Sequence, residues 1–261
     1  MKKVVYRSFI CIVYLFLYAP IFTLIANSFN SSRSRTTWGG FTLDWYRMLF
    51  KNTVILQALE NTIMIALISS LIAAILGTLA CVGMIHSKKF FQSSLISLNN
   101  IPMINPEIVM GISYMIFFVF VYKLTGFLKP GLLTLIIAHS TFCTPYVFLS
   151  VLPKIRQVTP QISEAAQDLG CTPFQAFYKV LLSQITPGIV TGIMMSFTMS
   201  IDDFTISYFT SGNVQTLPLA IYSMTRISVS PEINALSAIF FVTILFLLIL
   251  INLMNDNIEW V

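Results

Sequence analysis

Charged residues are scarce in this chain: only 10% of its 261 residues are Asp, Glu, Lys or Arg, and 56% are hydrophobic. Soluble proteins carry about 25% charged residues, whereas the mean hydropathy here is +0.83. The excess of five positive charges comes from single, scattered Lys and Arg residues, and no basic groove with interleaved aromatics can be traced. The composition therefore excludes an ordinary soluble domain and favours a membrane protein. It does not indicate nucleic-acid binding.

Residue patterns typical of catalytic or metal-binding sites are also missing. The four cysteines lie far apart without C-x-x-C spacing, and Cys11, Cys81 and Cys143 fall in apolar segments, so we expect small buried hydrophobes. The chain has no phosphate-binding G-x-x-x-x-G-K-[ST] pattern and no H-E-x-x-H pattern. His86 and His139 are isolated, and His139 is interpreted as a packed polar residue. We predict no catalytic residues and no metal site, and therefore no enzyme activity in this chain.

Six apolar stretches are long enough to cross a bilayer, which requires roughly 20 helical residues. Backbone groups have no water partner in hydrocarbon, so each stretch must be a helix. We predict an all-α polytopic membrane protein with six transmembrane helices in a single domain, residues 1–261. Pro20, Pro145 and Pro187 should mark kinks or helix ends. The spans are 9–26, 62–85, 108–122 (lengthened by the approach from residue 101), 131–152, 185–210 and 235–254.

Six spans place both termini on one side of the membrane. The first stretch resembles a signal peptide but is too long and lacks a clear cleavage site, so it is interpreted as a retained span. Lys and Arg are divided almost evenly between the two sides, and only the N-terminal cluster and the short HSKK loop favour cytoplasmic termini. The segment FTLDWYRMLF, residues 41–50, fits either an interfacial amphipathic helix or an aromatic anchor.

A polar stretch, SEAAQDLG at 163–170, interrupts this apolar pattern. Gly170 is a suitable residue to follow a helix C-terminus, and Thr172 with Gln175 forms a T-x-x-Q capping box. We therefore expect two short helices joined at a glycine, within a cytoplasmic loop of residues 154–186. The pattern leaves open whether this loop is merely solvated or docks on a partner.

The same stretch resembles the EAA loop of bacterial ABC-importer permeases. The matching residues are Glu164, Ala165, Ala166 and Gly170, followed by Val180 and Leu182 at the expected distance. Ser183 stands where the family has a proline, and Pro187 is the candidate to end the second helix instead. The resemblance implies the type I ABC-importer permease fold, with Glu164, Ala165, Ala166 and Gly170 coupling to an ATPase.

Further segments resemble the PotC-type permeases of spermidine/putrescine importers, in the same order along nearly the whole chain: YLFLYAPIFTLIANSFNSSR, NPEIVMGIS, HSTFCTPYVF, SFTMSIDDF, LPLAIYSM and ISVSPEINALS. The resemblance implies a multi-pass protein of the bacterial inner membrane with both termini in the cytoplasm. It also implies a second permease, a dimeric ABC ATPase that binds the ATP and Mg, and a periplasmic polyamine-binding protein; this chain itself would hold no cofactor. Alternatives are an ABC permease for another small substrate, or a carrier driven by an ion gradient.

Two adjacent carboxylates, Asp202 and Asp203, fall inside the fifth apolar stretch, where a charge costs ~2.5–3.5 kcal/mol. We expect one to face a substrate path and the other to be held by a structural hydrogen bond, the alternative being pairing between helices alone. Phe204 and Tyr208 could offer aromatic faces to an organic cation. Glu107, at the start of the third span, either caps its helix or contributes to the path.

Overall fold

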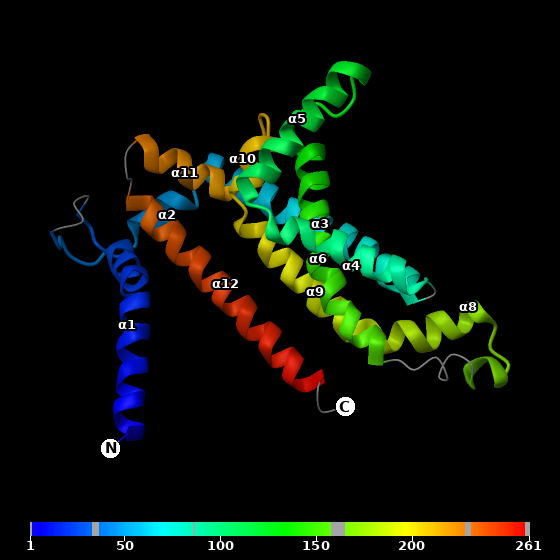
Figure 1. Ribbon diagram of the computed structural model, residues 1–261. Helices are drawn as coiled ribbons and strands as arrows, with labels where there is room; N and C mark the ends of the chain where they lie inside the picture. Colours follow the sequence, from blue (N-terminus) through cyan, green and yellow to red (C-terminus); the bar gives the residue numbers. More distant parts are fainter. Residues whose placement is uncertain (1, 33–36, 86, 158–164, 228–230, 259–261) are drawn as a thin grey trace. The chain divides into compact units, whose positions relative to one another are not determined.

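The computed structural model describes residues 2–32, 37–85, 87–157, 165–227 and 231–258 (Figure 1). The regular structure of these residues is helical apart from one isolated antiparallel bridge between Asn30 and Phe41, so the all-α prediction is confirmed. The helices are α1 (Lys2–Ser28), α2 (Asp44–Leu49), α3 (Thr53–Ile85), α4 (Lys89–Ile104), α5 (Glu107–Thr125), α6 (Leu132–Gln157), α8 (Pro173–Ala176), the π-helix η1 (Phe177–Leu181), α9 (Leu182–Asp202), α10 (Thr205–Thr210), α11 (Leu217–Ile227) and α12 (Pro231–Ile258).

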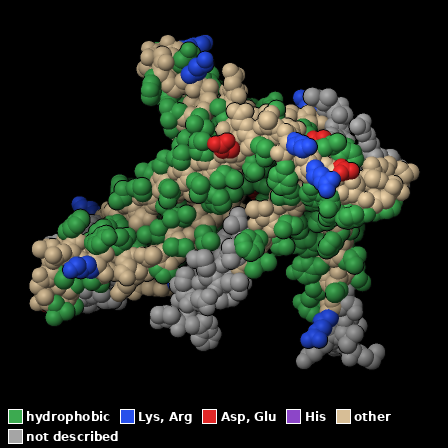
Figure 2. All heavy atoms as spheres, turned by 180° about the vertical axis from the view of Figure 1, so that it is seen from behind, with side chains coloured by type: hydrophobic (Ala, Val, Ile, Leu, Met, Phe, Trp, Pro, Cys, Tyr) green, Lys and Arg blue, Asp and Glu red, His purple; other side chains and the backbone are tan. Residues whose placement is uncertain are grey.

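The predicted spans all fall on helices. Five helical stretches are long and apolar enough to cross a membrane: Phe9–Ser28, Thr53–Met84, Glu107–Thr125, Leu132–Gln157 and Phe174–Asp202. A sixth, shorter apolar stretch, Pro231–Phe246, belongs to α12. Figure 2 shows one face on which apolar side chains dominate and Lys and Arg side chains are few. Pro20, Pro145 and Pro187 all lie inside helices, so none of them ends a helix.

The fifth predicted span, 185–210, is not one helix. α9 ends at Asp202, Asp203 is extended (φ −63°, ψ 118°), and α10 starts at Thr205. An apolar pattern alone does not show this break, because a break in hydrocarbon depends on side chains that satisfy the freed backbone groups. The prediction of a continuous helix was therefore wrong at the position of the two carboxylates.

The third predicted span is also interrupted. The approach from residue 101 does not lengthen it, because those residues form the end of a separate helix, α4. Asn105 is extended (ψ 139°), and Pro106 precedes the first residue of α5, Glu107. The residue before a proline is sterically pushed out of the helical region, which explains the end of α4.

The chain forms two compact units, one of residues up to 57 together with 220–249, the other of 58–219 together with residues from 250 on. In the first unit, the segment after α1 folds back through hydrogen bonds. The indole Nε1 of Trp45 donates to the carbonyl oxygen of Asn30 (2.7 Å), and the hydroxyls of Ser28 and Tyr46 lie 2.7 Å apart. The short helix expected within 41–50 is present as α2, with Trp45 buried and Phe41 exposed.

The second unit is built around α6, which packs along α9 (Figure 1). Small residues on α9 permit the close approach: Gly188, Gly192, Ser196 and Ser200 are all buried and recur every four positions, which places them on one helix face. Small residues at a helix interface let two backbones come together and gain van der Waals contact where lipid offers no hydrophobic driving force.

Two of the cysteines belong to this packed core. Cys81 and Cys143 are fully buried, as predicted, and the Sγ atoms donate to the carbonyl oxygens of Phe148 (3.3 Å) and Ser196 (3.4 Å). Cys11 is exposed on α1, so its predicted burial was wrong. An apolar segment in a membrane chain can face lipid as well as a core, and hydropathy does not separate the two.

Replacing Gly192 by Ala tests the α6–α9 contact. A Cβ at this position would lie 2.9 Å from the Cα of Val147, a backbone atom that cannot turn away. We expect Gly192→Ala to lower the melting temperature of the purified protein, because overpacking costs ~1–3 kcal/mol. Gly83→Ala is the matched control, since a Cβ there meets nothing within 4 Å and alanine favours a helix. Equal melting temperatures for both variants would contradict the close-packing role.

Candidate functional site

A pocket of about 300 Å³ lies in the second unit where the two helix interruptions meet. The end of α4, the start of α5, the middle of α6, the end of α9 and the start of α10 all contribute to it. Its lining combines three carboxylates with aromatic and thioether side chains. The lining residues are Pro102, Met103, Asn105, Glu107, Met110, Phe142, Tyr146, Met199, Asp202, Asp203, Phe204, Thr205 and Ile206.

Four of the five residues predicted for a substrate path line this pocket: Glu107, Asp202, Asp203 and Phe204. Tyr208 does not line it, but the Tyr208 ring lies beside that of Phe204, with centroids 5.7 Å apart. Glu107, Asp202 and Asp203 thus line one pocket. The tertiary structure therefore gathers acidic residues that lie almost 100 positions apart in the sequence.

The two adjacent aspartates have different environments. The Asp203 side chain is only 5% exposed, and its Oδ1 and Oδ2 accept hydrogen bonds from the backbone N–H groups of Ile206 (3.2 Å) and Ser207 (2.8 Å). These are N–H groups that the first turn of a helix cannot satisfy internally. Asp202, at the last position of α9, is exposed. Asp203 therefore caps α10, and Asp202 offers its carboxylate to the pocket.

Glu107 is the first residue of α5, and no side-chain capping bond is made by the preceding residue, Pro106. An acidic group in the first turn interacts favourably with the helix dipole, and Glu107 also lines the pocket. The two roles considered for Glu107 are thus compatible at one position.

The sequence interpretation missed the aromatic wall that α6 contributes. Phe142 and Tyr146 line the pocket, and the ring of Phe142 packs edge-on against that of His139 with centroids 5.3 Å apart. Positions 139, 142 and 146 follow the i, i+3, i+7 spacing of one helix face. That spacing was a signal that could have placed the two aromatics beside the buried histidine.

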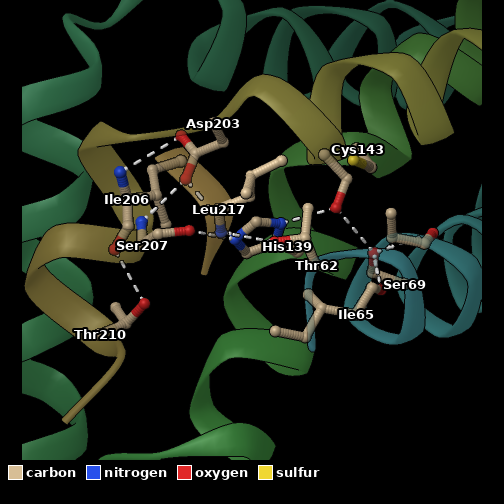
Figure 3. Close-up of polar contacts among 12 residues, drawn as sticks. Thr62, Ile65, Ser69, His139, Cys143, Asp203, Ile206, Ser207, Thr210 and Leu217 are labelled. Carbon is tan, nitrogen blue, oxygen red and sulfur yellow. Dashed lines mark hydrogen bonds and ion pairs between the residues drawn. The ribbon is translucent and has the colours of Figure 1, made fainter. Parts of the chain in front are cut away.

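Next to the pocket, a buried polar network joins α3, α6, α9 and α10 (Figure 3). His139 Nδ1 lies 2.7 Å from Ser200 Oγ, and Nε2 lies 3.0 Å from Ser207 Oγ. Ser200 Oγ in turn lies 3.2 Å from Ser69 Oγ. His139 is therefore a packed polar residue of the bundle, as its isolation in the sequence indicated. Across the described part of the chain, no three His, Cys, Asp or Glu side chains gather as a metal site would require.

The polar loop after α6 contains the glycine turn that the sequence predicted. Residues 165–168 form one helical turn, and Gly170 follows with φ +90°. The N–H of Cys171 donates to Ala166 O (3.0 Å) and that of Gly170 to Gln167 O (2.9 Å), which is the Schellman pattern. Ala165 is exposed and Ala166 buried. Glu164, the first residue of the predicted coupling set, lies outside the described residues.

The capping box at the second helix is confirmed. The N–H of Thr172 donates to Gln175 Oε1 (3.0 Å), and the N–H of Gln175 donates to Thr172 Oγ1 (3.3 Å). The helix that starts here does not stop near Ser183 or at Pro187. It runs through α8, η1 and α9 as one helical stretch to Asp202. The expectation of a separate short helix was wrong because a proline at position 187 removes one backbone donor without ending a packed helix.

Known structures share this fold. A bacterial ABC transporter that imports the acidic polysaccharide alginate aligns with 98% of this chain and 96% of its own chain, with a TM-score of 0.72 and 17% identity. A methionine ABC transporter in an inward-facing conformation gives a TM-score of 0.63 at 18% identity, covering 81% of this chain and 96% of that one. The chain therefore shares the helical fold of these two ABC transporter structures.

The sequence gives the family. Residues 69–259 match the family of binding-protein-dependent transport system inner membrane components, and the chain belongs to it. It is 37% identical over 246 residues, 93% of this chain and 90% of the relative, to the spermidine/putrescine transport system permease protein PotC of Escherichia coli K12. It is also 37% identical over 227 residues to that organism's putrescine transport system permease protein PotI, covering 86% of this chain and 81% of the relative.

The different environments of the two aspartates predict different stability effects. Asp203→Asn should lower the melting temperature, because an amide has one acceptor oxygen where the carboxylate uses two, and losing a cap costs ~0.5–2 kcal/mol. Asp202→Asn should leave the melting temperature close to wild type, since that side chain ends α9 in an exposed position. The measurement is thermal unfolding of both purified variants. A larger drop for Asp202→Asn would reverse the assignment.

Proposed function

We propose that this chain is the membrane permease subunit of an ABC importer of polyamines, and that the acidic pocket is part of the path that the substrate follows. The observation that carries the proposal is the convergence of Asp202, Glu107 and aromatic rings at two helix interruptions. Relatives that cover most of the chain carry the names of spermidine and putrescine permeases, which points to the same substrate class here.

The pocket chemistry suits an organic polycation. A polyamine presents ammonium groups separated by short apolar chains. Carboxylates of Asp202 and Glu107 would attract the ammonium groups, and Phe204 with Tyr146 would offer aromatic faces to them. Asp203 lines the same pocket and adds to its negative potential from its capping position, and Tyr208 extends the aromatic surface beside Phe204. Methionine side chains adapt to the methylene segments.

The partners follow from the family and the loop. We propose that a second permease completes the substrate path, that a dimeric ABC ATPase binds ATP and Mg, and that a periplasmic binding protein delivers the polyamine. The loop with Glu164, Ala165, Ala166 and Gly170 is proposed to dock on the ATPase. Leu169 and Phe174 are strongly exposed beside the glycine turn, which supports a surface that a soluble partner covers.

We further propose that the chain is a multi-pass protein of the bacterial inner membrane with both termini in the cytoplasm. The family is one of inner membrane components. Five helical stretches are long enough to cross, and the shorter apolar stretch Pro231–Phe246 would bring the number of crossings to six. The basic cluster of Lys2, Lys3 and Arg7 favours a cytoplasmic N-terminus.

The substrate proposal predicts a selective loss on removing one charge. Asp202→Asn keeps the shape of the side chain but not its charge, so uptake efficiency of radiolabelled putrescine or spermidine should fall by about tenfold or more, corresponding to ~1.4 kcal/mol. Glu107→Gln should show a smaller loss because part of its role is at the helix terminus. Membrane abundance, measured by immunoblot, should match wild type. Normal polyamine uptake by Asp202→Asn would locate the path elsewhere, and failure of the wild type to take up polyamines would indicate another small substrate.

The coupling proposal predicts that a substitution at the Gly170 turn impairs ATPase docking, whereas the same substitution at a turn elsewhere does not. Gly170 has φ +90°, so Gly170→Val forces a β-branched residue into the left-handed region. We expect reduced co-purification of the ATPase and loss of uptake while insertion stays normal. The matched control is Gly126→Val, where φ is +71° and the added side chain also meets open space, but at the end of α5. Equal effects of both changes on ATPase co-purification would argue against a docking role.

A further inference from the structure

The His139 side chain bridges the interruption between α9 and α10. One ring nitrogen contacts Ser200 in the last turn of α9, and the other contacts Ser207 in the first turn of α10 (Figure 3). The imidazole is 1% exposed. The extended residue Asp203 lies between the two serines in the sequence, so a single side chain of α6 holds both sides of the break.

One arrangement of protons makes all the contacts of His139, Ser69 and Ser200 with one another and with Ser207. The Ser69 hydroxyl donates to the carbonyl oxygen of Ile65 (2.6 Å), so towards Ser200 (3.2 Å) the Ser69 oxygen must accept. The Ser200 hydroxyl therefore donates its proton to the Ser69 oxygen, and Nδ1–H of His139 must donate to the Ser200 oxygen. Nε2 is left as the acceptor for the Ser207 hydroxyl. A neutral imidazole with its proton on Nδ1 thus satisfies both serines.

His139 does not line the pocket, yet its neighbours do. Phe142 packs on the imidazole and lines the pocket one turn further along α6. Ser200 precedes Asp202 by two residues, and Ser207 donates the backbone N–H that binds Asp203 Oδ2. The Nε2–Oδ2 distance of 3.5 Å between His139 and Asp203 is too long for a direct hydrogen bond. Besides the packing on Phe142 and the approach to Asp203, the hydrogen bonds of His139 reach the pocket through the two half-helices.

We propose that His139 is a positioning residue: by bonding Ser200 and Ser207 it fixes the α9–α10 break and so fixes Asp202 in the acidic pocket. The transport readout of this inference rests on the proposed function, because it assumes that a cation binds at Asp202. The role needs both a donor and an acceptor in the terminal group of one side chain. Glutamine offers that pair and leucine does not.

The first test is uptake kinetics of putrescine or spermidine with His139→Leu and His139→Gln. His139→Leu should raise KM at least ~10-fold with membrane abundance unchanged, because small misplacements of a binding group have large effects. His139→Gln should recover most of this loss. Ser140→Ala is the control: Ser140 is the buried neighbour on α6, and its hydroxyl donates to Ile136 O of its own helix. If Gln behaves like Leu, the ring's volume and not its hydrogen bonds is what matters, and the proposal fails.

The second test does not depend on substrate. Amide hydrogen exchange of residues 203–210 in the purified protein should be faster in His139→Leu and close to wild type in Ser140→Ala. Ser200→Ala and Ser207→Ala, which remove one contact each with little change of volume, should each show an intermediate effect and replace the histidine variant if it does not fold. Unchanged exchange in both serine variants overturns the positioning role. If the wild type takes up no polyamine, the proposed function falls, while the exchange result still decides the role of His139.

Discussion

A helix that starts inside an apolar span leaves the N–H groups of its first turn without partners, and hydrocarbon supplies none. The α9–α10 interruption depends on one solution to this constraint: both carboxylate oxygens of Asp203 accept N–H groups from the start of α10. With those groups satisfied, the chain can change direction at Asp203 and open a pocket between half-helices. The pocket lining comes from residues on both sides of this break, so the site exists only because the cap does.

The cap also explains why two adjacent acidic residues are present. A carboxylate in an apolar span costs ~2.5–3.5 kcal/mol, and the two side chains reduce this cost differently. The side chain of Asp203 is 5% exposed and binds backbone donors, whereas Asp202 is exposed and lines the pocket. The first holds the geometry and the second carries the charge that a proposed cationic substrate would meet.

The pocket and the glycine loop are connected by one continuous element. From Phe174 to Asp202 the chain is helical over 29 residues, roughly 43 Å at 1.5 Å per residue. Its only irregularity among the described helical residues is the π-helical turn Phe177–Leu181, a distortion that is frequent at functional sites. A displacement of the loop by the proposed ATPase would therefore act on the carboxylate end of the same helix, without an intervening hinge loop.

The sequence by itself determined the features that depend on local chemistry. Hydropathy gave the spans, because long runs of apolar side chains favour the bilayer core and the backbone there must be helical. Gly170, Thr172 and Gln175 gave the turn and the capping box, because these bonds join near neighbours. Tertiary structure decided the approach of Glu107 to Asp202 and the aromatic wall of Phe142 and Tyr146, and it contributes to the break at Asp203. The approach of Glu107 and the aromatic wall rest on contacts between distant helices, so no short window of the sequence contains both partners. At the break, Asp203 bonds near neighbours, but His139 of α6 bonds both sides of it from another helix.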